Sequence, residues 1–240
     1  MELEDFCTLS DNSLMNTAKI INKTWFLLSL CCLTMSSQAS TTPIKQTQTV
    51  HQANDLGQQL YDKYQWSALY YYGQTVNGAL VGTAVGNFNH WPEHIQSLEL
   101  AYTLDKNNFF RRFVNPLVGV TQLAANVTVR QGNDEHTIYE FNPYIIFRWA
   151  NWPWNDRVVT SLALAEGVSY VTSVPALERR DNENTRRLLN YLMFEITLAA
   201  PSTPNLQFVV RIHHRSGAYG LYQADNSGSN VIGAGIRYLF

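Results

Sequence analysis

Apolar and polar side chains alternate with a period of two through most of the chain, which predicts β-strands rather than helices. In the last segment, Ile236 and Tyr238 fall on one face and Arg237 falls on the other. The segments 137–149 and 205–214 divide in the same way. Because successive side chains of a strand point to opposite sides, each strand is expected to have one apolar face and one face that carries charges.

Two architectures satisfy this alternation. A soluble sandwich buries its apolar faces and exposes the charged ones, whereas a membrane barrel turns the apolar faces to lipid and the charged faces to a small lumen. The mean hydropathy of -0.19 excludes a bundle of transmembrane helices. The net charge of -2 gives no basic excess for nucleic acid. A barrel is compatible with both values, because alternation hides its apolar residues.

The end of the chain and the aromatic residues favour the barrel. The chain ends in the pattern Gly235-x-x-Tyr238-x-Phe240, which resembles the C-terminal signal by which the barrel-assembly machinery recognises outer-membrane barrels. Aromatic residues also cluster at one strand end, as in the girdle at a membrane interface: Trp149, Trp152 and Trp154. We therefore expect an all-β protein, an antiparallel transmembrane β-barrel of the bacterial outer membrane, formed by residues 65–240.

Counting back from the C-terminus predicts eight strands, an even number as in bacterial barrels. Their expected ranges are 79–86, 94–104, 117–129, 137–149, 157–172, 188–199, 205–214 and 230–240, with 66–73 as a candidate first half of strand one. If the last strand runs toward the periplasm, 175–187 and 215–229 are outer loops and 200–204 is a short periplasmic turn. The connection 105–116 is then unexpectedly long for a periplasmic turn.

Residues 1–39 have the features of a secretory signal peptide. A short apolar run, WFLLSLCCL at 25–33, follows basic residues and precedes a small-x-small site. The run is too short to cross a bilayer as a helix, and cleavage is expected after Ala39. Acidic residues are unusual before such a leader, so translation starting at Met15 is a further option. A lipid anchor at Cys31 is the rival interpretation, which the bulky Leu30 disfavours.

The cysteines and the segment after the leader fit an exported protein. All three cysteines, Cys7, Cys31 and Cys32, precede the expected cleavage site, so the mature protein is expected to contain none, which suits an oxidising compartment. Residues 40–64 are polar and are interpreted as a periplasmic lead-in, with a short helix near 54–63.

One group of residues near the end of the penultimate strand could carry chemistry. His214 and Ser216 are two residues apart, so they share a face at a separation of ~6.6 Å. Serine needs a base such as histidine to become a good nucleophile, and backbone N–H groups around Gly217 could stabilise an oxyanion. The alternation places both residues, and Asn230 at the start of the last strand, on the lipid-facing side of the outer rim.

This arrangement resembles the lipid A 3-O-deacylases of the PagL type, which are outer-membrane acyloxyacyl hydrolases built as eight-stranded barrels. The family has a His-x-Ser motif near the end of the penultimate strand and a Glu at the start of the last strand. The resemblance implies that Ser216 is the nucleophile and His214 the base of a hydrolase that removes an ester-linked acyl chain from lipid A of the lipopolysaccharide. In this chain, Gly217 stands where the family has Asn, and Asn230 stands where it has Glu.

An asparagine can orient an imidazole through its carbonyl, as in Cys-His-Asn proteases, but it cannot stabilise an imidazolium by charge. We therefore predict His214, Ser216 and Asn230 as the catalytic residues, with Asp225 of the adjoining loop as a substitute for Asn230. The alternative function is a non-catalytic small barrel with a structural or adhesive role, acting through the loops 175–187 and 215–229.

Other polar groups have structural interpretations. His213 and His214 could simply be interfacial polar residues, and Ser169 in the run 166–170 lacks a convincing base. Residues 178–181 are interpreted as a solvated loop. No metal or cofactor is predicted, because the histidines lack metal-site spacing and a phosphate-binding glycine loop is absent. Charged residues of both signs are expected to pair in the lumen: Glu99, Glu140, Glu195, Arg148, Arg211 and Arg237.

Overall fold

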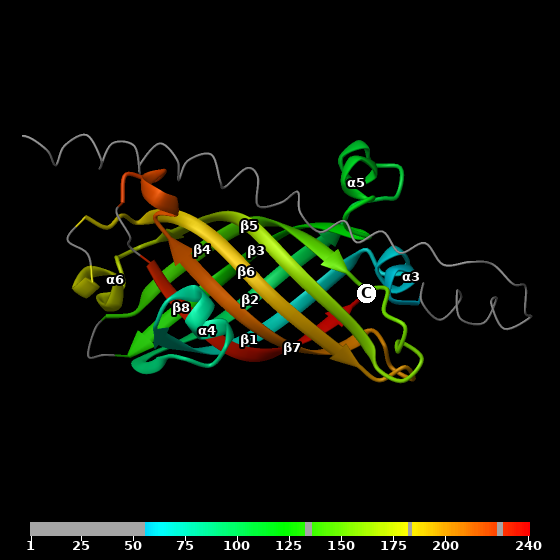
Figure 1. The fold of residues 1–240 in the computed structure, drawn as a ribbon, viewed down its shortest axis with the longest axis horizontal. Coiled ribbons are helices and arrows are strands. Elements are labelled where there is room, and N and C mark those ends of the chain that lie inside the picture. Colours follow the sequence, from blue (N-terminus) through cyan, green and yellow to red (C-terminus); the bar gives the residue numbers. More distant parts are fainter. Residues whose placement is uncertain (1–55, 133–135, 182–183, 225–227) are drawn as a thin grey trace, which may run out of the picture. The chain divides into compact units, whose positions relative to one another are not determined.

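Eight antiparallel strands form a closed barrel (Figure 1). The computed structural model describes residues 56–132, 136–181, 184–224 and 228–240. The strands are β1 Trp66–Asn77, β2 Asn89–Thr103, β3 Val120–Gly132, β4 Ile138–Trp149, β5 Val159–Val171, β6 Leu188–Ala199, β7 Leu206–Ser216 and β8 Gly228–Leu239. The predicted fold class is therefore confirmed. The expected signal peptide, the three cysteines, residues 40–55 and Asp225 lie outside the described residues.

The prediction for the first strand is confirmed at its candidate first half, 66–73, which lies within β1, and is wrong for 79–86. Residues 80–84, expected inside a strand at 79–86, form the short helix α4 (Leu80–Ala84). Strand β1 instead uses 66–77, because this is the segment that can pair with both β2 and β8 and so close the barrel, in a register that runs from Ser67 opposite Leu239 to Val76 opposite Asn230. The alternation at 79–86 is short, and it ends at Gly86, whose φ of 81° is typical of glycine.

The strand period decides which side chains face the membrane and which face the lumen. In β7, Leu206 and Phe208 are 50% and 46% exposed, whereas Gln207 and Arg211 are each 1% exposed. The same contrast recurs along the other strands, where apolar residues dominate the outer surface and charged residues are buried inside. Of the two architectures compatible with the sequence, the structure is the barrel.

The charged lumenal residues pair with one another, as the sequence predicts. Glu195 lies 2.8 Å from Arg148 and 2.9 Å from Arg237, and it also pairs with Arg211. Glu99 pairs with the last two of these arginines. All five side chains are less than 5% exposed. Burying charges this deeply is tolerated only when they are paired and hydrogen-bonded, so this cluster is a structural core rather than a reactive site.

The helix α3 (Leu56–Lys63) packs on the end of the barrel where β8 finishes (Figure 1). Tyr61 is 1% exposed, and its hydroxyl donates to Gln207 at 3.1 Å inside the lumen. Gly57 allows this close approach, because a Cβ there would lie 1.8 Å from the carbonyl oxygen of Ala150. The segment before β1 therefore covers one end of the lumen.

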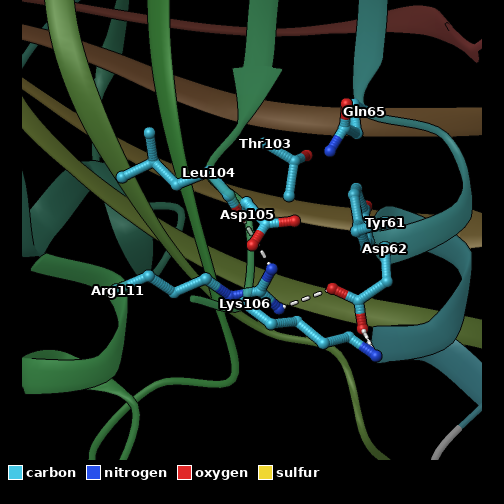
Figure 2. Close-up of a pocket in the computed structure, with 8 residues that line it drawn as sticks. All are labelled: Tyr61, Asp62, Gln65, Thr103, Leu104, Asp105, Lys106 and Arg111. Carbon is cyan, nitrogen blue, oxygen red and sulfur yellow. Dashed lines mark hydrogen bonds and ion pairs between the residues drawn. The ribbon is translucent and has the colours of Figure 1, made fainter. Parts of the chain in front are cut away.

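The long connection 105–116 contains the helix α5 (Phe109–Val114), which explains its length. Its Arg111 is buried, donates to the carbonyl of Leu104 at 2.7 Å and pairs with Asp62 of α3 at 2.7 Å. Figure 2 shows the Asp62 carboxylate between Arg111 and Lys106, beside a cavity of about 110 Å³. The connection therefore holds α3 against the barrel end.

Candidate functional site

The register of the last two strands brings His214 and Asn230 together. His214 of β7 lies directly opposite Asn230 of β8. Both residues occupy even-numbered positions, which face outward along β7 and at Ile236 and Tyr238 of β8, as the alternation predicts, and Asn230 itself is 4% exposed. His214 Nδ1 and Asn230 Oδ1 are 2.7 Å apart, a normal hydrogen-bond distance. The structure thus places two of the three predicted site residues in contact on the outer surface.

A second hydrogen bond determines which way the Asn230 amide points. Its Nδ2 donates to the carbonyl oxygen of Gly78 at 2.7 Å. A carbonyl only accepts, so the amide nitrogen must face Gly78 and the amide oxygen must face His214. Because that oxygen also only accepts, Nδ1 of His214 carries a proton. Nε2 of the neutral ring then has the free lone pair that a general base needs.

Ser216 is the last residue of β7 and shares the outward face with His214. It lies opposite Gly228 of β8 and Asn190 of β6. Among the described hydrogen bonds, none joins Ser216 to His214 or Asn230, so the structure places Ser216 beside these residues without a direct bond. Gly228 lets β8 approach closely, because a Cβ there would lie 2.3 Å from the carbonyl oxygen of Arg215.

The strand ends that carry these residues are held from inside the barrel. The helix α6 (Ala176–Asp181) inserts Glu178, which is 0% exposed, into this end of the lumen. Glu178 accepts from Arg215 at 2.9 Å and from Ser229 at 2.7 Å. The interpretation of 178–181 as a solvated loop is therefore wrong for Glu178. Its partners are the immediate neighbours of Ser216 and Asn230, so the network stiffens the rim beneath the site.

The segment after β7 has strained backbone geometry. Ala218 and Tyr219 have φ angles of 47° and 55°, and Gln223 has 53°. Left-handed backbone costs about 1–2 kcal/mol per non-glycine residue. Burial and, to a lesser degree, the charge of Glu166 raise the pKa of Tyr222 in this segment. The strained segment thus begins two residues after Ser216.

The other serine and histidine considered in the sequence face the lumen. Ser169 is 0% exposed and donates to Glu140 at 2.8 Å. His213 is 1% exposed, and its Nε2 lies 2.7 Å from the same carboxylate. Both side chains are therefore used in lumenal packing, and only His214 of the histidine pair reaches the outer face.

A closed antiparallel barrel with an apolar outer surface and a charged, internally paired lumen defines a transmembrane β-barrel of the bacterial outer membrane. Within the described part of the chain, no helix has the length and apolar character needed to cross a bilayer.

The chain is similar to solved structures of outer-membrane barrels. No family model and no curated protein matches it. It resembles the outer membrane enzyme PagL at 16% identity and a TM-score of 0.45, over 72% of this chain and 99% of that one. It resembles Neisserial surface protein A at 10% identity and a TM-score of 0.43, over 73% of this chain and 96% of that one. It resembles the N-terminal barrel domain of Pseudomonas aeruginosa OprF at 12% identity and a TM-score of 0.42, over 74% of this chain and 98% of that one. Similarity at this level carries no information about the chemistry of the site.

Proposed function

We propose that the chain is an outer-membrane esterase that removes an ester-linked acyl chain from lipid A, by 3-O-deacylation as in the PagL-type family that its motif resembles. The observation that carries the proposal is the hydrogen-bonded series from His214 through Asn230 to Gly78 on the outward face. Polar side chains on a lipid-facing surface are energetically costly, and a hydrogen-bonded group of them is therefore a candidate functional site. An ester bond of an outer-leaflet lipid would meet this part of the rim.

The proposed reaction uses Ser216 as nucleophile. Its Oγ forms a bond to the ester carbonyl carbon while its proton passes to Nε2 of His214, and the carbonyl electron pair moves onto oxygen. The tetrahedral intermediate then expels the sugar alkoxide, which takes the proton from His214. Water attacks the acyl-serine by the same route and releases the fatty acid. Asn230 keeps the ring of His214 in the tautomer that can accept the proton.

Asn230 replaces the carboxylate that the resemblance would lead one to expect. An amide supplies no negative charge to stabilise the imidazolium, so the proposed enzyme relies on orientation of the ring rather than on charge. The proposed partners are lipid A in the outer leaflet and, during assembly, the barrel-assembly machinery, through the Phe240 ending.

Mass spectrometry of lipid A from cells that express the wild type or Ser216→Ala tests this function. We expect loss of one hydroxyacyl chain with the wild type and intact lipid A with Ser216→Ala. Gln96→Ala serves as the control, because Gln96 is another polar residue on the outer face, in β2. Heat-modifiable migration would verify that each barrel is folded. Intact lipid A with the folded wild type would refute the esterase and favour the non-catalytic barrel.

A further inference from the structure

A second pair of polar side chains lies on the outer face next to Ser216. Asn190 of β6 is directly opposite Ser216. Glu166 of β5 is opposite Leu192, two positions along from Asn190. All of these positions are even-numbered, and in β5 and β6 even-numbered residues point away from the lumen. Directly opposed side chains are about 4.5–5.5 Å apart at Cβ, and diagonal ones about 7–8 Å, so Asn190 lies between Glu166 and Ser216.

Asn190 is unusually well covered for an outward residue. It is 7% exposed, whereas its apolar outward neighbours Leu188 and Phe194 are 46% and 40% exposed. The Glu166 carboxylate lies diagonal to it on β5, near enough to interact with its amide. An ionised carboxylate only accepts hydrogen bonds, so this interaction favours the orientation in which the nitrogen of the Asn190 amide faces Glu166. That nitrogen carries two N–H groups, which leaves a second donor available beside Ser216.

The other neighbour of Ser216 brings no side chain. Gly228 opposes Ser216 from β8. The side chain of Asn230 is already hydrogen-bonded to the imidazole of His214. Of the two residues directly opposite Ser216, Asn190 is therefore the one with a side-chain N–H. Ester hydrolysis through a serine needs such a donor where the carbonyl oxygen becomes negative.

We propose that Asn190 is the oxyanion donor of the site and that Glu166 is a positioning residue that orients its amide. The proposal rests on the proposed esterase function. When Ser216 bonds to the carbonyl carbon and the carbonyl electron pair moves onto oxygen, the free N–H of Asn190 donates to that oxygen. Asn190 and the His214–Asn230 pair then act from opposite sides of Ser216, one on the oxyanion and the other on the proton.

The separation of the charges suits these roles. Neighbouring strands are about 4.8 Å apart, so the Glu166 carboxylate belongs to a strand ~10 Å from that of Ser216, whereas Asn190 belongs to the adjacent strand. The oxyanion would therefore be closer to the amide of Asn190 than to the negative charge of Glu166. A carboxylate on the lipid-facing surface is destabilising. The proposed role of Glu166 in orienting the Asn190 amide would account for its presence there.

Kinetics of lipid A deacylation in mixed micelles test the assignment. Asn190→Leu, which suits a lipid-facing position, should lower kcat by about 10²–10³-fold, the usual effect of losing one oxyanion donor, with KM little changed. Glu166→Gln should lower kcat less, because its carbonyl can still accept from Asn190. The matched control is Gln96→Leu, an equivalent exchange on the far outer face, and it should retain wild-type kcat. Heat-modifiable migration would establish that the variants fold.

A covalent probe gives a second readout that does not depend on the identity of the natural lipid. An alkyl fluorophosphonate would form a Ser216 Oγ–phosphorus bond with loss of fluoride, and we expect slower labelling in Asn190→Leu than in Gln96→Leu. Wild-type kcat and labelling in folded Asn190→Leu, with activity still abolished by Ser216→Ala, would overturn the inference alone. A folded wild type that neither deacylates lipid A nor labels at Ser216 would overturn the proposed function together with it.

Discussion

Substitution of Asn230 separates the two hydrogen bonds that its amide makes at once. Asn230→Ala removes both the acceptor of His214 and the donor to Gly78. Asn230→Asp keeps an acceptor for the imidazole but loses the donor to the Gly78 carbonyl. The two variants therefore distinguish the role of Asn230 in orienting the base from its role in holding the loop before α4.

The expected magnitudes follow from these contacts. Asn230 is 4% exposed, and each hydrogen bond contributes about 0.5–1.5 kcal/mol, so Asn230→Ala should lower the free energy of unfolding by about 1–3 kcal/mol. Its kcat should fall by at most the general-base contribution, about 10²–10⁴-fold. Asn230→Asp should be destabilised by about 1–3 kcal/mol, because the Gly78 carbonyl loses its partner. Its kcat should equal or exceed that of the wild type, since a carboxylate also stabilises the imidazolium.

Two assays measure the two effects. Deacylation of lipid A at saturating substrate gives kcat, and urea titration followed by heat-modifiable migration gives the free energy of unfolding. A folded Asn230→Ala variant with wild-type kcat would refute the argument that Asn230 sets the tautomer of His214. A loss of kcat in Asn230→Asp as large as that in Asn230→Ala would show that the amide donor, rather than the acceptor, matters.

Three further substitutions test the structure that supports the site. Glu195→Gln would remove the negative charge that pairs with three buried arginines and should lower the free energy of unfolding by about 3–5 kcal/mol. An unchanged urea midpoint would contradict the importance of the lumenal ion pairs. Gly57→Ala would place a Cβ 1.8 Å from the carbonyl oxygen of Ala150, so we expect α3 to undock and be cleaved faster by added trypsin, and wild-type proteolysis would count against its docking. Gly228→Ala would bring a Cβ 2.3 Å from the carbonyl oxygen of Arg215 and should lower kcat in a barrel that still folds; full activity would show that the β7–β8 spacing tolerates a side chain.

The barrel and the facing of its residues were predictable because the strand period is a local property. Alternation along a single strand assigns each residue to the lipid-facing or the lumenal side. It placed His214 and Ser216 outward and Arg211 inward without knowledge of any neighbouring strand. The pairing of the lumenal charges was predictable for a related reason, since charges confined to a narrow interior must find partners.

Tertiary structure decided which residues lie opposite one another. The position of β1 depended on pairing with β8 at the other end of the chain. The orientation of Asn230 depended on the Gly78 carbonyl, and the burial of Glu178 on the docking of α6. The juxtaposition of Asn190 with Ser216 likewise came from the register of β6 and β7. Register and loop docking are set by contacts between distant segments, so no pattern within a single strand could have revealed them.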